Sequence, residues 1–227
     1  MTLHQYPDME QRSDEWYAAR RGIGTASAVS QLLTPTLKVA DNETARALTH
    51  TLALERITGW TEETPVTSDM WRGIEHEPIA RDIYSEHNAP AIEVGFMRRD
   101  EDGWSLGYSP DGLVGDNGLI EIKCPKARTH FRTILSGSVP GYYMAQVQAG
   151  LLVSGREWLD FVSFSGGLPL WVKRVHPDEQ WFDAITAACI QFERNVAEVI
   201  RNYQDRAVGL PATERVPDYN EVELKLS

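Results

Sequence analysis

Cysteine, long apolar runs and an excess of basic charge are all scarce or missing in this sequence of 227 residues. Its cysteines, Cys124 and Cys189, lie far apart, so they favour reduced thiols over a disulfide and are too few for a cysteine-built metal site. No apolar run reaches the roughly 18–20 residues that a membrane helix needs. The first residues are polar and acidic, unlike a secretory signal. We therefore expect a cytoplasmic protein with no membrane segment.

The net charge of −11 argues at first against a protein that binds nucleic acid, because phosphate contacts need Lys and Arg. Net charge, however, describes the average surface and not a cleft. Basic pairs do occur, at Arg20-Arg21 and Arg98-Arg99, and a divalent metal would make a carboxylate site less negative. The charge therefore lowers the expectation of DNA binding without excluding it.

Hydrophobic periodicity and turn signals predict a single α/β (α+β) domain over residues 1–227, with a central mixed β-sheet flanked by helices. We expect a helical part over 1–90, a sheet core with the catalytic residues over 91–176, a C-terminal helix over 177–204 and a polar tail over 205–227. The expected helices cover 14–21, 26–33, 41–59, 70–87, 140–153 and 177–203, and the expected strands cover 92–98, 104–108, 113–114, 119–124, 158–164 and 170–175.

Local residues refine two of the expected helices. Gly73 and Pro78 predict that the helix over 70–87 becomes regular only after Glu75. Thr25 is the expected N-cap of the helix over 26–33.

The segment SPDGLVGDNGLIEIKCPK, residues 109–126, places charged side chains on a strand that should be apolar. Glu121 and Lys123 are two residues apart on this strand, so they point to one face, and the apolar residues between them point to the other. The Asp-Asn-Gly turn folds the preceding strand back and brings Asp111 close to Glu121. Two carboxylates at close range repel unless a cation lies between them, and hard oxygen ligands suit Mg²⁺ or Mn²⁺. Lys123 would then orient or deprotonate an attacking water, or neutralise developing charge.

The same pattern also has a structural interpretation. Charged residues that alternate along a strand often form a solvated outer face, Asp-Gly turns are common, and Glu-x-Lys alone has little specificity. From these residues by themselves, a metal-binding face and a solvated face both remain open.

Pro110-Asp111 followed by Glu121-Ile122-Lys123 resembles the PD-(D/E)xK nuclease signature, and the surrounding sequence extends the match. The further matching positions are Trp16, Arg20, Gly22, Thr25-Ala26-Ser27, Gly73, Glu77, Ser109 and Tyr143–Gln148. In this order they resemble the lambda-exonuclease family of phage-type recombination exonucleases. The resemblance covers roughly residues 13–165 and implies a restriction-endonuclease-like core.

The resemblance implies an exonuclease that degrades one strand of linear double-stranded DNA, 5′→3′, from a 5′-phosphorylated end, and leaves a 3′ single strand for recombination. It implies that Asp111 and Glu121 bind Mg²⁺, with Mn²⁺ as a substitute, and that the backbone carbonyl of Ile122 is a further ligand. Lys123 would act on the nucleophilic water, and Glu77 would help to hold a second ion. The alternative for Glu77 is an ordinary surface glutamate.

The resemblance also implies a pocket for the 5′-phosphate, built from Arg20, Ser27, Ser109 and Gln146. Two physical arguments support it independently. Ser27 lies in the first turn of an expected helix, where free backbone N–H groups favour an anion, and the guanidinium of Arg20 suits a bidentate phosphate contact. The alternatives are a surface arginine, a plain capping serine and an ordinary glutamine on a helix.

Met70 falls where the family places an apolar wedge that splits the terminal base pair, although Met70 and Trp71 would equally suit the core. Arg98-Arg99 would lie either along the DNA path or at a solvated strand end. The segment between Leu33 and Leu48 departs from the family pattern, so a family arginine that tracks the minor groove is not carried over.

The implied partners are linear double-stranded DNA, a single-strand annealing protein and two further copies of the chain in a ring-shaped homotrimer, in a bacterial cell as a phage- or prophage-type protein. Two other functions remain open. One is a structure- or site-specific endonuclease on the same fold, and the other is a catalytically silent DNA-binding module. The clustered Asp111, Glu121 and Lys123 argue against the silent module, which would not need them.

Overall fold

The computed structural model describes residues 2–62 and 65–216. Its helices are α1 (Asp14–Arg20), a 3₁₀ helix (Ala26–Gln31), α2 (Glu43–Thr58), α3 (Ser68–His87), α4 (Ala127–Ser136), α5 (Gly141–Ser154) and α6 (Glu179–Ala207). Its strands are β1 (Thr2–Tyr6), β2 (Ala91–Ile92), β3 (Phe96–Glu101), β4 (Trp104–Tyr108), β5 (Gly112–Val114), β6 (Gly118–Lys123), β7 (Trp158–Ser163) and β8 (Trp171–Val175).

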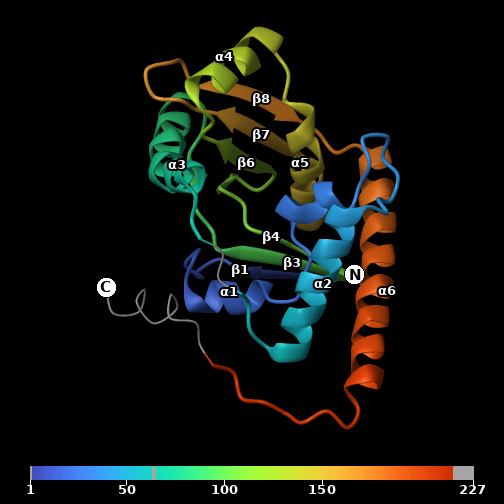
Figure 1. Ribbon diagram of the computed structural model, residues 1–227. Coiled ribbons are helices and arrows are strands. Elements are labelled where there is room, and N and C mark those ends of the chain that lie inside the picture. The colour runs from blue at the N-terminus through green and yellow to red at the C-terminus, as the bar shows by residue number, and fades with distance from the viewer. Residues whose placement is uncertain (1, 63–64, 217–227) are drawn as a thin grey trace.

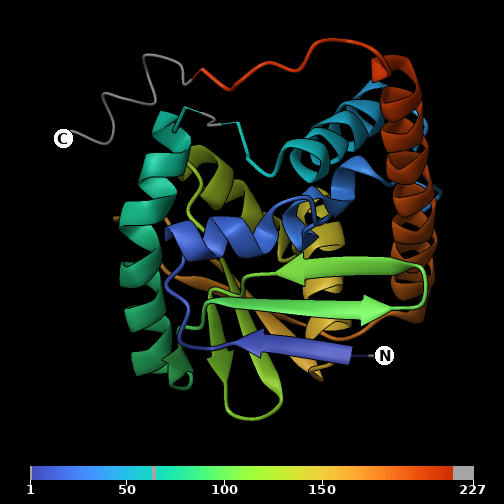
Figure 2. The ribbon, with the colours of Figure 1, turned by 90° about the horizontal axis from the view of Figure 1, so that it is seen from below.

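The strands form a mixed five-stranded sheet and a smaller antiparallel one (Figure 1). The larger sheet has the order β2-β5-β6-β7-β8, and in it β6 and β7 are parallel while the other neighbours are antiparallel. The smaller sheet has the order β1-β3-β4, and Figure 2 shows its strands side by side between α3 and α6. The prediction of an α+β fold with a mixed sheet flanked by helices is confirmed.

Two short connections carry the chain between the two sheets, and the sequence did not reveal either crossing. The single strand predicted over 92–98 is wrong, because β2 ends at Ile92 in one sheet and β3 begins at Phe96 in the other. Gly95 lies at this crossing, where a Cβ atom would stand 2.0 Å from the carbonyl oxygen of Met9. The second crossing is Ser109-Pro110-Asp111, between β4 and β5. Asp111 therefore lies where the two sheets meet.

Strand β6 is buried on both faces, although charged residues alternate along one of them. Ile120 and Ile122 pack in one apolar cluster with Ala80 and Tyr84 of α3, while Leu119 belongs to the main core on the other side. Figure 1 shows α3 and α5 on opposite sides of the larger sheet. The face of β6 that carries Glu121 is therefore the one that α5 covers.

Helix α3 corrects the expectation that regular helix begins only after Glu75. It runs without interruption from Ser68, because the Thr67 side chain accepts a hydrogen bond from Met70 N and caps the first turn. Pro78 inside the helix removes one backbone N–H, and burial of Ala80 and Tyr84 against the sheet offsets that loss.

Other elements depart from the sequence prediction in smaller ways. Strand β1 was not predicted; it pairs with β3 at the edge of the small sheet, in the part expected to be helical. Helix α4 was not predicted either, and its buried residues include His130 and Thr133. Helix α6 continues to Ala207, beyond its predicted end, and it buries Ile185, Ala188, Phe192 and Val196. Both cysteines are free thiols. No helix within the described ranges is long and apolar enough to cross a membrane.

Candidate active site

The hairpin of β5 and β6 brings Asp111 to the strand that carries Glu121, as predicted. Gly112 pairs with Ile120 in the antiparallel register, so the residue before Gly112 lies beside the end of β6. The backbone N–H of Ile122 donates to Oδ2 of Asp111 at 2.5 Å. This hydrogen bond fixes the Asp111 carboxylate across the turn from Glu121.

Glu121 is only 1% exposed, which excludes the interpretation of a solvated outer face. Its Oε1 accepts hydrogen bonds from Lys123 Nζ at 2.7 Å and from Gln146 Nε2 on α5. The hydroxyl of Tyr108, which is itself buried, donates to Oε2 at 3.0 Å. These three donors offset the free energy that it costs to bury a carboxylate away from water.

The carboxylates of Asp111, Glu121 and Glu77 lie close enough together for neighbouring charges to raise the pKa of Asp111 and of Glu77. Partial burial raises the pKa of Asp111 well above its ordinary value, and the charges of Glu121 and Glu77 raise it further. Burial alone would lower the pKa of Lys123, but Glu121 and Asp111 raise it above its ordinary value. Lys123 is therefore held as a cation between the two acidic groups.

The donor set fits a hard divalent cation at Asp111 and Glu121. A cation would relieve the repulsion that raises the pKa of Asp111. A carboxylate has about four acceptor sites, and Glu121 uses three of them for Lys123, Gln146 and Tyr108. Among the described residues, no three His, Cys, Asp or Glu side chains approach closely enough to form a metal site by themselves. A cation here would therefore need the carboxylate pair together with backbone oxygens or water.

Glu77 is not an ordinary surface glutamate, because its side chain is only 16% exposed. It is held by Arg81 at 2.8 Å and by Arg12 at 3.5 Å. Burial raises the pKa of Glu77, and Glu121 is among the neighbouring charges that raise it further. The structure thus brings Glu77 near the carboxylate pair but engages it with arginines, and its role at a second ion remains a prediction.

Two residues of this site were missed in the sequence. Arg81 Nε donates to the backbone oxygen of Asp111 at 2.7 Å and so ties α3 to the crossing between the sheets. Tyr108 precedes the recognised segment, and its hydroxyl reaches Glu121. The sequence around Arg81 and Tyr108 does not mark either as a site residue, because an arginine in a helix and a tyrosine in a strand are both common.

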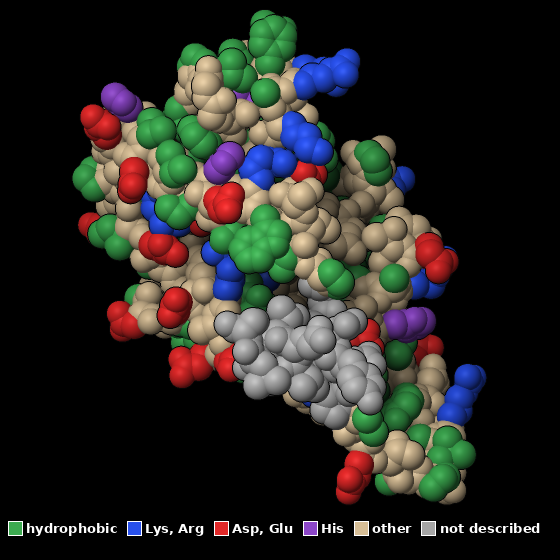
Figure 3. Space-filling model, turned by 60° about the vertical axis from the view of Figure 1, so that its left-hand side comes forward, with side chains coloured by type: hydrophobic (Ala, Val, Ile, Leu, Met, Phe, Trp, Pro, Cys, Tyr) green, Lys and Arg blue, Asp and Glu red, His purple; other side chains and the backbone are tan. Residues whose placement is uncertain are grey.

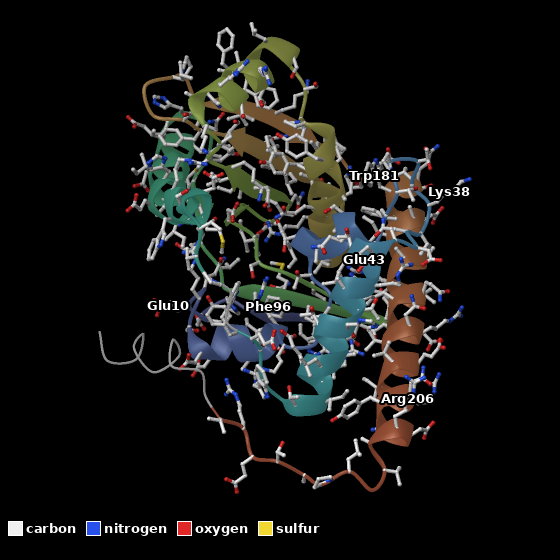
Figure 4. All side chains as sticks on the ribbon, in the orientation of Figure 1. Glu10, Lys38, Glu43, Phe96, Trp181 and Arg206 are labelled. Carbon is white, nitrogen blue, oxygen red and sulfur yellow. The ribbon has the colours of Figure 1, made fainter. Side chains whose placement is uncertain are left out.

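Arg20 and Ser109, two of the residues assigned to the 5′-phosphate, are in direct contact. Arg20 donates to Ser109 Oγ at 3.1 Å, and Trp16 Nε1 donates to the same oxygen at 2.9 Å. The Arg20 guanidinium stacks over the Trp16 ring at 3.9 Å and lies 5.9 Å from the ring of Phe96, which is labelled on β3 beside α1 in Figure 4. Burial lowers the pKa of Arg20 to about 10. This partly desolvated cation is suited to an anionic ligand.

Ser27 and Gln146, the other two residues assigned to the 5′-phosphate, do not contact Arg20 or Ser109 through a hydrogen bond that the structure shows; each bonds a different side chain. Ser27 Oγ hydrogen-bonds Thr25 Oγ1 at 3.1 Å, within a 3₁₀ helix that Thr25 does not cap through its side chain. Thr25 thus occupies the expected N-cap position, but its hydroxyl bonds the Ser27 side chain and makes no capping hydrogen bond to the helix backbone. Gln146 contacts Glu121 and so joins the carboxylate cluster. The roles of both residues in phosphate binding remain predictions.

Met70 and Trp71 do not belong to the core, because they are 47% and 54% exposed. The alternative of core packing is therefore excluded, and the wedge role of Met70 remains a prediction. Arg99 is not at a solvated strand end: it is buried and donates to the backbone oxygen of Val153 at 3.1 Å. Arg98 pairs with Asp100 at 2.7 Å.

The turn after Arg20 is clamped by two consecutive residues of α2. Gly22 N–H donates to Glu55 Oε2 at 2.6 Å, and Arg56 Nε donates to Gly22 O at 2.7 Å. Arg56 in turn makes a bidentate pair with Glu193 of α6, at 2.7 and 2.8 Å. Gly22 has a φ of +68°, and a Cβ atom there would lie 2.6 Å from Arg56 Cγ, so glycine is required. This network holds the loop between Arg20 and Ser27.

Replacing Glu193 with alanine is expected to lower the free energy of unfolding by about 1–2 kcal/mol, because it breaks a charge-assisted bidentate pair. Chemical denaturation measures the change. The matched control is Asp41→Ala, which removes the exposed partner of Arg46 on the same helix and should cost less than about 0.5 kcal/mol. Equal losses for both variants would show that the clamp does not stabilise the fold.

Comparison with known proteins places this geometry in a family. The family model described as the YqaJ-like viral recombinase domain matches residues 15–157, more than half of the chain. The chain belongs to this family. Its match includes the Arg20 turn, the Ser109-Pro110-Asp111 crossing and strand β6. The predicted resemblance to lambda-exonuclease-type proteins is thereby confirmed, and a comparison with curated protein sequences gave no match.

Solved structures of relatives agree with the YqaJ-like assignment. The alkaline exonuclease LHK-Exo from Laribacter hongkongensis is 34% identical, with a TM-score of 0.78 over 88% of this chain and 100% of that protein. LHK-Exo in complex with dAMP gives 34% identity and a TM-score of 0.77, with the same coverage. A phage-related exonuclease from Haemophilus somnus 129PT is 14% identical, with a TM-score of 0.58 over 80% of this chain and 96% of that one, and shows the fold alone. Family and relative together support a recombination exonuclease.

Proposed function

We propose that this chain is a Mg²⁺-dependent 5′→3′ exonuclease that degrades one strand of linear double-stranded DNA from a 5′-phosphorylated end. The 3′ single-stranded overhang that remains would serve phage-type recombination. One observation carries the proposal: Ser109 contacts Arg20, and Asp111, two residues later, contacts β6 beside Glu121. A rigid Pro110 separates them. An anion-binding group and a carboxylate cluster are thus held at a fixed separation, which suits cleavage at a set distance from a terminal phosphate.

Each residue then has a defined task at the scissile bond. Asp111 and Glu121, with the Ile122 carbonyl, would hold Mg²⁺, or Mn²⁺ in its place, and Glu77 would support a second ion. When bound, the ions would polarise the scissile phosphate and activate a water molecule. Lys123 is held as a cation by Glu121 and lies ready to orient that water and to offset negative charge as the phosphate is attacked. Arg20 and Ser109, with Ser27 and Gln146, would bind the 5′-phosphate.

The relative LHK-Exo gives separate support for an exonuclease that releases mononucleotides. LHK-Exo is named an alkaline exonuclease, and it has been crystallised with dAMP, a nucleoside monophosphate. A mononucleotide is the product that stepwise removal of nucleotides would release.

The deciding experiment is digestion of end-labelled linear duplex DNA by the purified chain, with and without Mg²⁺. We expect label to be released from a 5′-phosphorylated end in the presence of Mg²⁺, and the complementary strand to survive. A covalently closed circle should stay intact. Cutting of the circle would favour the endonuclease, and absence of turnover on every substrate would favour the silent module.

Replacement of Arg20 by alanine should abolish the preference for phosphorylated ends. The wild-type protein should digest a 5′-phosphorylated duplex faster than a 5′-hydroxyl duplex by about tenfold or more, because a charge-assisted bidentate contact contributes about 1.5–3 kcal/mol. The variant should digest both at the slower rate. The control is Arg46→Ala, whose arginine is exposed on α2 away from this group. Equal wild-type rates on the two ends would remove the phosphate pocket from the proposal.

The proposal extends to assembly. A ring of three chains around the DNA would keep an acidic protein on its substrate without tight binding, and a single-strand annealing protein would receive the overhang. The molar mass in light scattering tests the ring: three chains support it, and a monomer at the concentration used for digestion contradicts it.

A further inference from the structure

Helices α3 and α4 together present exposed aromatic and basic side chains on one face of the molecule. Trp71, in the first turn of α3, is 54% exposed, and Phe131 of α4 is 53% exposed. Figure 3 shows hydrophobic and Lys or Arg side chains interspersed on this side of the protein. We name the group the α3–α4 surface; it consists of Met70, Trp71, Lys126, Arg128, Phe131 and Arg132.

Two contacts fix the first turn of α3 to the segment at the start of α4. Lys126 Nζ lies 3.4 Å from Asp69 of α3, and Arg72 Nε donates to the backbone oxygen of Cys124 at 2.9 Å. Asp69 is also paired with Arg72, at 2.9 Å. The first turn of α3 is thus fixed to the start of α4, and the acidic residue between them is neutralised by two cations.

Helix α4 is oriented opposite to what its composition would favour. Its polar residues His130 and Thr133 are buried, and His130 bonds Ser163 at 2.7 Å and the backbone oxygen of Pro169 at 3.0 Å. Its large apolar residues Phe131 and Leu135 are exposed. Residues 127–136 include two arginines and no acidic residue, in a protein with a net charge of −11. An outward face of this kind suits a ligand that is both anionic and able to cover aromatic rings.

We propose that the α3–α4 surface binds single-stranded DNA. Unpaired bases expose aromatic faces that stack on tryptophan and phenylalanine, and the phosphates between them bind Lys and Arg. A DNA duplex offers no base faces for such stacking, so the exposed rings favour a single strand. Charge complementarity and interleaved aromatic rings therefore point to the same ligand.

The surface follows the candidate active site directly in the chain, and Arg72 of α3 donates to the backbone oxygen of Cys124, the residue after Lys123. Lys126 follows Lys123 by three residues, and Lys123 Nζ lies 5.5 Å from the ring of Tyr143. The rings of Tyr143 and Tyr142 are tilted against each other with centroids 4.4 Å apart, and Tyr142 is 62% exposed. A strand separated from its complement beside Met70 would meet Trp71 first and then the cations of α4. This path rests on the proposed function, in which an unpaired strand forms next to the carboxylate cluster.

The test is binding of a fluorescein-labelled oligothymidylate to the full chain, followed by anisotropy in EDTA so that no hydrolysis occurs. Trp71→Ala and Phe131→Ala should each weaken binding by about tenfold, the effect of losing one stacked base. Arg128→Gln with Arg132→Gln should reduce the salt dependence of log affinity by about 0.7 for each cation removed. The controls are Tyr203→Ala, a 53% exposed aromatic on α6, and Arg206→Gln on the same helix, and neither should change binding. Circular dichroism checks that each variant is folded.

Several outcomes would overturn the inference. Unchanged oligothymidylate affinity in the folded Trp71 and Phe131 variants would do so, even if wild-type digestion proceeds as proposed. An equal loss of affinity for a blunt duplex would make the surface a general DNA contact. Loss of self-association in light scattering, with oligothymidylate binding intact, would make it an interface between copies. Failure of the proposed function would show separately, as absence of wild-type digestion with Mg²⁺.

Discussion

Alanine in place of Lys123 is expected to slow Mg²⁺-dependent digestion of linear duplex DNA by about 10²–10³-fold, the usual effect of removing one charge-stabilising group. Lys123 is the cation nearest Glu121, at 2.7 Å, and Glu121 and Asp111 keep it protonated. Its loss should leave DNA binding and the fold intact, because apolar residues anchor β6 on its other face. Digestion of end-labelled duplex and binding of the same duplex in EDTA measure the two effects separately.

The matched control for this variant is Lys173→Ala. Lys173 is an exposed lysine on β8, the last strand of the larger sheet, and its replacement should leave digestion unchanged. Wild-type digestion rates in the Lys123 variant would exclude any role of this side chain at the scissile bond. A parallel loss of DNA binding would assign Lys123 to binding and not to the chemical step.

Asp111→Asn should have two opposite effects, which makes it the more diagnostic variant. Digestion should fall by at least about a hundredfold, because a metal ligand loses its charge. In EDTA, however, the variant should melt about 2–4 °C higher than the wild type, the shift that about 1 kcal/mol produces in a chain of this size. The reason is that Asn keeps an oxygen for the Ile122 N–H but removes the repulsion from Glu121 and Glu77. Thermal unfolding with and without Mg²⁺ measures both states.

The sign of the pH dependence follows from the same carboxyl group. Burial and neighbouring charges raise the pKa of Asp111 in the folded protein well above 3.8, so the fold binds its proton more tightly than the unfolded chain does. The stabilising contribution is full below about 3.8 and is lost as the pH rises through the folded-state pKa. In EDTA, the melting temperature of the wild type should therefore fall more steeply over this range than that of Asp111→Asn. Parallel curves would contradict the crowding of charges at this site.

Mg²⁺ should also change the repulsion between these carboxylates. It should raise the melting temperature of the wild type at neutral pH, because a cation between the carboxylates relieves their repulsion. It should have little effect on Asp111→Asn. A metal-induced shift of equal size in both proteins would place the cation elsewhere.

The sequence alone determined the local structure of the candidate active site. The two-residue spacing of Glu121 and Lys123 fixes them on one face of a strand, and the Asn-Gly turn at 117–118 fixes the hairpin that brings back Asp111. Both features depend on neighbours within a dozen residues, so periodicity and turn chemistry are sufficient to predict them. The motif order along the chain was also sufficient to identify the family.

Only the tertiary structure decided how these pieces meet. It separated the strands into two sheets that join at Ser109-Pro110-Asp111, placed Tyr108 and Gln146 against Glu121, and bound Gly22 to Glu55 and Arg56 of α2. It also turned the apolar side of α4 outward, because the pair of His130 with Ser163 holds the polar side against β7. These contacts join residues far apart in the chain, and their geometry depends on the packing of whole helices and sheets. No local pattern of residue types encodes that packing.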